Sequence, residues 1–266
     1  MRRNQMESKI DVETARMRQS DSLPQPAGQN LWRVHAMTAR ASTEPLEVVC
    51  CGSSTTSGMS ATAPSRRWVN LCAEALQRSI HPTLPTHPTL VLDDADQRNT
   101  DAPGLRIINA GVPGTTSQNY LTPASVSAIS RIAPRLVIHM VGSNDAWAGV
   151  HPDRYRAQLH AQFSRLQDAT SVDCIHLLVH SYARYDEFTP VAPWAAYGEV
   201  LSAIAAERED TAAVDISGIY AAVGVPGNDP RHFMTDDRVH QTDAGHAFMA
   251  KVMARVLEPA QGATGY

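Results

Sequence analysis

The sequence lacks the features that would place it in a membrane or on nucleic acid. None of its apolar runs is long enough to cross a bilayer, and the polar start from Met1 to Lys9 has no apolar stretch of the kind found in a secretory signal. It also has no run of Lys and Arg with interleaved aromatic residues, and its formal net charge is -4. We therefore expect no membrane span, a cytoplasmic location and no nucleic-acid partner.

Cysteine is scarce as well. The sequence has 4 cysteines, none in a Cys-x-x-Cys pair or a Cys/His cluster, so no zinc site is indicated. Buried, reduced thiols are the favoured interpretation, which fits a reducing compartment. With 43% hydrophobic and 19% charged residues over a length of 266, the composition is that of a globular protein with one domain and some extra chain. The four cysteines are Cys50, Cys51, Cys72 and Cys174.

Short apolar runs alternate with helical patterns from residue 46 onward. This alternation predicts a parallel sheet covered by helices on both faces, with the last helix from about Thr242 to Leu257. The stretches 81–104 and 181–193 are interpreted as loops. The five expected strands are 46–51, 105–109, 136–141, 174–179 and 212–216.

The two ends of the chain differ from this middle part. Residues 1–45 mix charges, Gln, Ser and Pro without sustained periodicity, so we expect a mobile N-terminal tail or arm. Residues 46–258 are expected to form one domain, followed by a C-terminal tail at 259–266. If this arm packs on a second copy of the chain, the protein forms a homo-oligomer, and this possibility stays open.

A Gly-Ser-Ser turn follows the first expected strand and places Ser54 at the carboxyl end of that strand, where open α/β sheets bind ligands. Such a serine is either a nucleophile or the cap of the next helix. A nucleophile needs a base, and His240 lies just before the last helix. Asp237, three residues upstream, can accept the Nδ1 proton of His240 and leave Nε2 to deprotonate Ser54.

Donors for an oxyanion are also present. Gly114 offers a backbone N–H without a side chain in the way, Asn144 offers a side-chain amide, and the Ser54 N–H is a third candidate. The alternatives are that Asn144 has only a structural role, in stabilising a turn, and that a backbone carbonyl orients His240 in place of Asp237.

Taken in order, four short motifs resemble the blocks of the SGNH (GDSL-type) hydrolase superfamily. The resemblance spans residue 46 to about 257 and implies a three-layer α/β/α sandwich, flavodoxin-like, with a five-stranded parallel sheet. It also implies a Ser-His-Asp hydrolase of esters that uses no metal or other cofactor. The motifs are Gly52–Ser54, Asn109–Thr116, Gly142–Asp145 and Asp237–His240.

Carried over by position, the resemblance makes Ser54 the nucleophile. It makes Gly114 and Asn144 oxyanion donors, His240 the base and Asp237 its orienting group. The serine block departs from the usual pattern, because Ser53 stands where most of the superfamily has Asp. The missing carboxylate is expected to alter local hydrogen bonding and substrate preference, and Ser54 is preferred to Ser53 as the nucleophile.

Three further side chains are candidates for a substrate pocket. Trp147 follows the asparagine block and either gives an apolar wall for an acyl group or packs in the core. His180 and Tyr182 follow the fourth expected strand and either line the pocket or belong to a solvated loop.

The favoured function is a serine hydrolase that cleaves carboxylic esters through an acyl-enzyme, with a small-molecule ester as substrate. The low aromatic content of 6% and the lack of a long apolar flap favour short acyl or acetyl esters. One alternative is an acyltransferase, in which a sugar, alcohol or amine replaces water. The other is a non-catalytic binding protein with the same fold.

Overall fold

A computed structural model describes residues 28–80, 82–83, 86–97, 101–171, 173–182, 191–222, 233–237 and 239–258. Within these ranges the chain forms a seven-stranded sheet with the order β1-β7-β6-β5-β2-β4-β3. All neighbouring strands are parallel except β1, which pairs antiparallel with β7. The strands are β1 (Gly28–Gln29), β2 (Pro45–Gly52), β3 (Leu90–Val91), β4 (Gly104–Gly111), β5 (Leu136–Met140), β6 (Ile175–His180) and β7 (Thr211–Asp215).

The five predicted strands correspond to β2, β4, β5, β6 and β7, so the predicted α/β class and its three layers are confirmed. The predicted count of five strands is corrected to seven in the described residues, because β1 and β3 add two residues each at opposite edges. Strands this short carry no readable alternation of apolar and polar residues.

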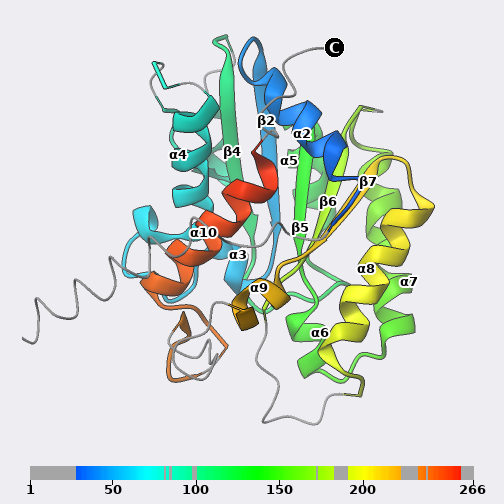
Figure 1. Ribbon diagram of the computed structural model, residues 1–266. Coiled ribbons are helices and arrows are strands. Elements are labelled where there is room, and N and C mark those ends of the chain that lie inside the picture. Colours follow the sequence, from blue (N-terminus) through cyan, green and yellow to red (C-terminus); the bar gives the residue numbers. More distant parts are fainter. Residues whose placement is uncertain are drawn as a thin grey trace, which may run out of the picture.

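Helices cover both faces of the sheet (Figure 1). One face packs against α2, α4 and α10, and the other against α5, α7 and α8, so the apolar core has two parts. The helices are α2 (Leu31–Arg40), α3 (Ser54–Ser57), α4 (Trp68–Ile80), α5 (Pro123–Ile132), α6 (Ser143–Trp147), α7 (Pro152–Gln167), α8 (Trp194–Glu207), α9 (Ser217–Ala222) and α10 (Asp243–Leu257), with 3₁₀ turns η2 (Pro64–Arg66) and η3 (Leu92–Gln97).

The neighbouring strands β5, β2 and β4 are mostly apolar because both faces of the sheet are covered. Their carboxyl ends align, since Gly52 of β2 pairs with Gly111 of β4 and with Met140 of β5. Whatever follows these three strands is therefore brought to one edge of the sheet.

The domain begins earlier than the sequence predicts. Residues 28–45 were expected to belong to a mobile arm, but they contain β1 and α2 and lead into β2. Val34 and Met37 of α2 are buried in the core, and the Asn30 amide donates to the carbonyl oxygens of Ala205 and Thr211. Residues 1–27 and the tail at 259–266 lie outside the described residues.

The stretch 81–104, expected to be a loop, contains β3 and η3. All four cysteines are buried and unpaired, as expected, and burial raises the pKa of the Cys51, Cys72 and Cys174 thiols to about 12. In the described part of the chain, no helix combines the length and apolar character needed to span a membrane.

Candidate active site

Ser54 is the first residue of α3, directly beyond the carboxyl end of β2. Gly52 ends that strand where a larger residue has no room, because a Cβ atom there would lie 2.2 Å from Thr56 Oγ1 and 2.3 Å from the Met140 carbonyl oxygen. The short helix ends at Gly58, whose φ of 79° suits glycine. The turn therefore folds tightly against the sheet and holds Ser54 at its edge.

His240 connects Ser54 to Asp237. Its Nδ1 atom lies 2.6 Å from Asp237 Oδ2, and its Nε2 atom lies 3.1 Å from Ser54 Oγ. An ionised carboxylate only accepts hydrogen bonds, so in the neutral imidazole Nδ1 carries the proton and Nε2 accepts the Ser54 hydroxyl proton. Residues 186 positions apart in the sequence thus meet in the arrangement needed to activate an alcohol.

Asp237 is held by its own loop. Its Oδ1 atom accepts the backbone N–H groups of Val239 and His240, each over 2.9 Å, and the Thr235 hydroxyl over 2.6 Å. Burial alone raises the pKa of Asp237, but hydrogen bonds from His240, Thr235 and Val239 outweigh it and hold this pKa well below its usual range. The carboxylate is therefore ionised at neutral pH.

Thr235 also supports the site, although no motif in the sequence marks it as a partner of Asp237. Its N–H donates to the His240 carbonyl oxygen over 2.8 Å, and Met234 forms an isolated antiparallel bridge with Gln241. The segment therefore closes on itself just before α10, whose first turn is capped by Thr242.

The glycine-rich loop after β4 is tied to the serine turn. The Val112 N–H donates to the Gly52 carbonyl oxygen over 2.9 Å, and the Thr115 hydroxyl donates to the Val112 carbonyl oxygen over 2.8 Å. Gly114 has a φ of 76°, which favours glycine, and no heavy atom lies within 4 Å of the position its Cβ would take. The backbone at Gly114 is therefore not covered by neighbouring atoms on that side.

Asn144, in α6, donates its side-chain amide to the Thr115 carbonyl oxygen over 2.8 Å. This bond uses one of the two amide protons and fixes the plane of the group, so that the second can donate to a bound oxyanion.

The next residue, Asp145, is fully buried and accepts the Ser117 N–H over 2.9 Å and the Ser117 hydroxyl over 2.5 Å. Burial raises the pKa of Asp145 despite these bonds. Asp145 therefore joins α6 to the glycine-rich loop, a contact that the sequence did not reveal.

The three pocket candidates differ in position. Trp147 ends α6 with 60% of its surface exposed. His180 is buried at the end of β6, where its ring stacks on Trp194 at 4.4 Å between centroids and burial lowers its pKa to about 4. Tyr182 is half-buried and stacks on Tyr220 at 5.4 Å. The last two rings have packing roles, and a place for any of the three in a substrate pocket stays a prediction.

Among the described residues, no group of three or more His, Cys, Asp or Glu side chains is arranged to hold a metal ion.

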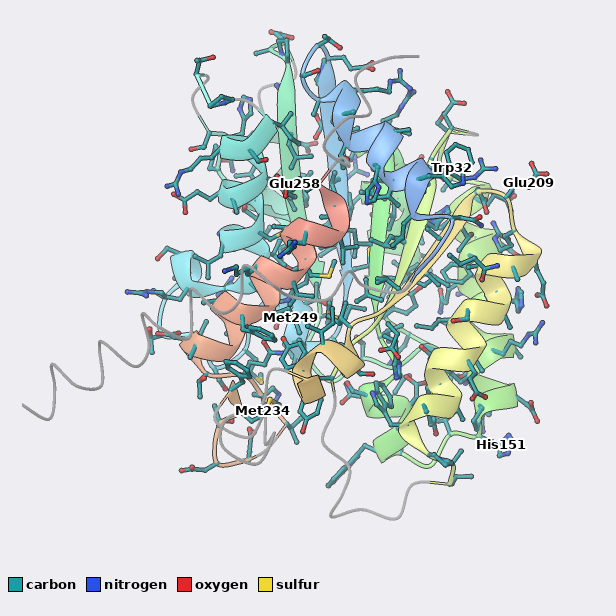
Figure 2. The ribbon with its side chains drawn as sticks, viewed as in Figure 1. Trp32, His151, Glu209, Met234, Met249 and Glu258 are labelled. Carbon is teal, nitrogen blue, oxygen red and sulfur yellow. The ribbon has the colours of Figure 1, made fainter. Side chains whose placement is uncertain are left out.

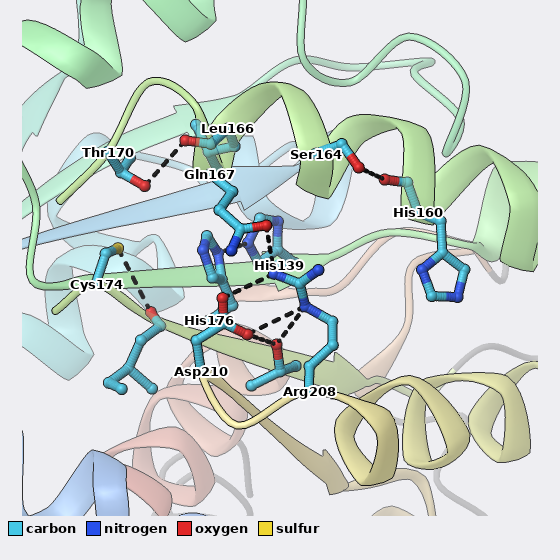
Figure 3. Close-up of polar contacts among 12 residues, drawn as sticks. His139, His160, Ser164, Leu166, Gln167, Thr170, Cys174, His176, Arg208 and Asp210 are labelled. Carbon is cyan, nitrogen blue, oxygen red and sulfur yellow. Dashed lines mark hydrogen bonds and ion pairs between the residues drawn. The ribbon is translucent and has the colours of Figure 1, made fainter. Parts of the chain in front are cut away.

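A cavity of about 670 Å³ opens at the end of the sheet opposite Ser54, beside α2 and the start of β6. It is lined by Trp32, His176, Glu209 and others but by none of the catalytic candidates. Figure 2 places Trp32 and Glu209 at that end and Met234, next to the His240 loop, at the other. Figure 3 shows the polar contacts there, with Arg208 paired to Asp210.

Comparison with known proteins identifies the class. Residues 50–248 match the GDSL-like lipase/acylhydrolase family, so the chain belongs to this family. No curated relative matches the sequence significantly.

Solved structures share the fold at low sequence identity. A two-domain esterase active on acetylated mannans matches with 21% identity and a TM-score of 0.59, over 88% of this chain and 55% of that one. The chain thus spans about half the length of that esterase. TesA matches with 20% identity and a TM-score of 0.55, over 81% of this chain and 99% of its own. Axe2, an acetylxylan esterase from Geobacillus stearothermophilus, matches with 20% identity and a TM-score of 0.56, over 81% and 94%.

Proposed function

We propose that the protein hydrolyses carboxylic esters through an acyl-enzyme on Ser54. The observation that carries the proposal is the 3.1 Å contact between Ser54 Oγ and His240 Nε2, with Asp237 behind the ring. His240 takes the hydroxyl proton as Ser54 attacks the ester carbonyl, then gives it to the departing alkoxide. Water, deprotonated by the same imidazole, releases the acid and restores the serine.

Negative charge develops on the carbonyl oxygen during both steps. We assign its stabilisation to the backbone N–H groups of Gly114 and Ser54 and to the Asn144 amide. Support comes from the hydrogen bonds that fix the Asn144 side chain and the glycine-rich loop before any substrate arrives. Donors fixed in advance need no reorganisation when the charge appears, which is the source of their catalytic effect.

For the acyl group we propose acetyl or another short chain. The low aromatic content of 6% supports this choice. Two of the similar structures are described as an acetylxylan esterase and as an esterase active on acetylated mannans, which makes acetyl esters suitable first substrates.

Hydrolysis is favoured over acyl transfer because the side chains of Asp237 and His240, the groups that would activate a water molecule, are partly exposed to solvent. The side chain of Asp237 is 48% exposed and that of His240 is 20% exposed. An acyltransferase must keep water from the acyl-enzyme. The acyltransferase alternative stays a prediction, tested by analysing products when a small alcohol is added as acceptor.

Turnover of p-nitrophenyl acetate tests the proposal. We expect Ser54→Ala to lower turnover of p-nitrophenyl acetate to the uncatalysed background, while the circular dichroism spectrum and Tm stay unchanged. Ser57→Ala, in the same short helix, is the matched control and is expected to keep measurable turnover. Turnover by folded Ser54→Ala equal to that of the wild type would reject the proposal.

A further inference from the structure

Exposed apolar side chains gather at the candidate active site. In the part of the chain that the structure describes, seven large hydrophobic side chains are exposed, and five of them belong to the segments around the catalytic candidates. We call these five the apolar rim. A concentration of exposed apolar surface commonly marks a binding site. The rim consists of Met59, Val112, Trp147, Val191 and Val239.

Two rim residues flank Ser54 and His240. The Met59 N–H donates to the Ser54 carbonyl oxygen over 3.0 Å, and the Met59 carbonyl oxygen accepts His246 Nε2 over 3.1 Å. Val239 directly precedes His240, and its N–H donates to Asp237. Val239 therefore lies next to the base that returns a proton to the leaving group, and the backbone of Met59 is held against that of Ser54.

The other three flank the oxyanion donors. Val112 lies two residues before Gly114. Trp147 comes three residues after Asn144, which is about one helical turn along α6. Val191 lies beside the end of α6, because its Cγ2 atom is 3.4 Å from the position a Cβ would take at Gly149.

We propose that the apolar rim binds the alcohol portion of the substrate, so that the enzyme selects short-acyl esters of apolar alcohols. This inference rests on the proposed function, because an acyl group as short as acetyl, bound to Ser54, is too small to reach all five rim residues. The part of the ester that extends to side chains from five separate segments is then the alcohol. The alkoxide oxygen must also face His240 Nε2 to be protonated, which directs the alcohol toward Val239 and Met59.

The chemistry of the rim favours an alkyl or aryl alcohol over a sugar. Three valines, a methionine and a tryptophan give apolar contact but no carboxylate, amide or guanidinium of their own to pair with several hydroxyl groups. An alkyl chain laid on such a surface gains free energy in proportion to the area removed from water.

Acetate esters of increasing alcohol length test the inference. Ethyl, butyl, hexyl and octyl acetate are each assayed by pH-stat at concentrations below and above their solubility limits, and kcat/KM is taken from the concentrations below the limit. Full burial of one methylene group changes affinity about fourfold. Each methylene added to the alcohol is covered by the rim on one side only, so we expect it to raise kcat/KM about twofold, up to hexyl acetate. Contact between the alcohol chain and the rim stabilises the ground state and the transition state equally, so we expect the effect mainly as a lower KM.

Trp147→Ala is expected to reduce the hexyl-to-ethyl ratio of kcat/KM about fivefold, and Val112→Ser to reduce it about threefold. Trp32→Ala is the matched control. Trp32 is similarly exposed, at 64%, but it lies at the opposite end of the sheet from the His240 loop (Figure 2). The control should keep the wild-type ratio.

The inference would be overturned by a flat length profile in the wild type. It would also be overturned by a Trp147→Ala ratio equal to that of Trp32→Ala, or by a higher kcat/KM for an acetylated sugar than for hexyl acetate. A rate that rises only above the solubility limit would also overturn it, because it indicates binding to an aggregated lipid surface. Failure of the proposed function looks different, because then no ester shows turnover that depends on Ser54.

Discussion

The Nδ1 atom of His240 lies 2.6 Å from one oxygen of Asp237, while the other oxygen of that carboxylate accepts the backbone N–H of His240 itself. One carboxylate thus orients both the ring and the main chain of the same residue. Because these bonds and the Thr235 hydroxyl overcome the effect of burial and lower the pKa of Asp237, the group stays ionised throughout the pH range of an esterase assay. The imidazole is held in the tautomer that leaves Nε2 facing Ser54.

Replacing that carboxylate with an amide is expected to preserve the loop but favour the wrong tautomer. We expect Asp237→Asn to lower kcat on p-nitrophenyl acetate by roughly 10³–10⁴, with little change in KM. Asp236→Asn is the control, because it changes the neighbouring exposed carboxylate. Equal kcat values for the two variants would show that Asp237 does not orient the base.

The Asn144 amide is expected to act mainly in the transition state. Loss of one oxyanion donor costs about 2.7–4 kcal/mol, so Asn144→Ala should reduce kcat by about 10²–10³ and leave KM within a few-fold. Asn70→Ala, in the first turn of α4 and outside the four motifs, serves as the control for a change of the same kind. A fall confined to KM would place Asn144 in substrate binding instead.

Ser53 is predicted to be replaceable. It is buried before α3 and caps the helix with its backbone, but its side chain makes no capping hydrogen bond. We expect Ser53→Ala to keep kcat/KM within about threefold of the wild type, because removing a hydroxyl without a capping role costs little. A loss as large as that of Ser54→Ala would reopen the question of which serine attacks.

Acid should weaken the fold through buried imidazoles. Burial lowers the pKa of His176 and of His180 to about 4, and that of His139 well below its usual range. In the unfolded chain these groups titrate near about 6.5, so the unfolded state binds more protons below that pH. The stability they contribute is complete above about pH 6.5 and is lost as the pH falls toward 4.

Urea denaturation at pH 7 and pH 5 checks this expectation. Each buried imidazole should cost up to about 1.4 kcal/mol of unfolding free energy per pH unit in that window. His176→Gln should show a shallower decline than the exposed-site control His151→Gln. Unchanged stability between the two pH values would mean that the buried rings take up protons in the folded state as readily as in the unfolded chain.

Much of this architecture could be predicted from the sequence. The β-branched run before Gly52 predicts a buried strand, and the order of the four motifs places Ser54, Gly114, Asn144 and His240 at one edge. These features are local, since each depends on a few adjacent residues and on the rule that parallel strands end together.

The missed features depend on contacts between distant residues. Asn30 secures the start of α2 by bonding to carbonyls more than 170 positions away, and no periodicity in residues 28–45 announces this. Asp145 resembles a turn or cap residue in the sequence, but it accepts both donors of Ser117, 28 positions earlier. The burial of His180 and its stacking on Trp194 are also not evident from the sequence, because the depth of His180 at the end of β6 is set by the helices that cover the strand.

The central claim is that His240 activates the Ser54 hydroxyl, and labelling with a fluorophosphonate tests it most directly. Intact mass spectrometry and peptide mapping should show one phosphonyl group, located on Ser54, and His240→Ala should slow labelling by at least about 10² as base assistance is lost. A label on Ser53 or another residue, or an unlabelled protein that still hydrolyses esters, would contradict the account.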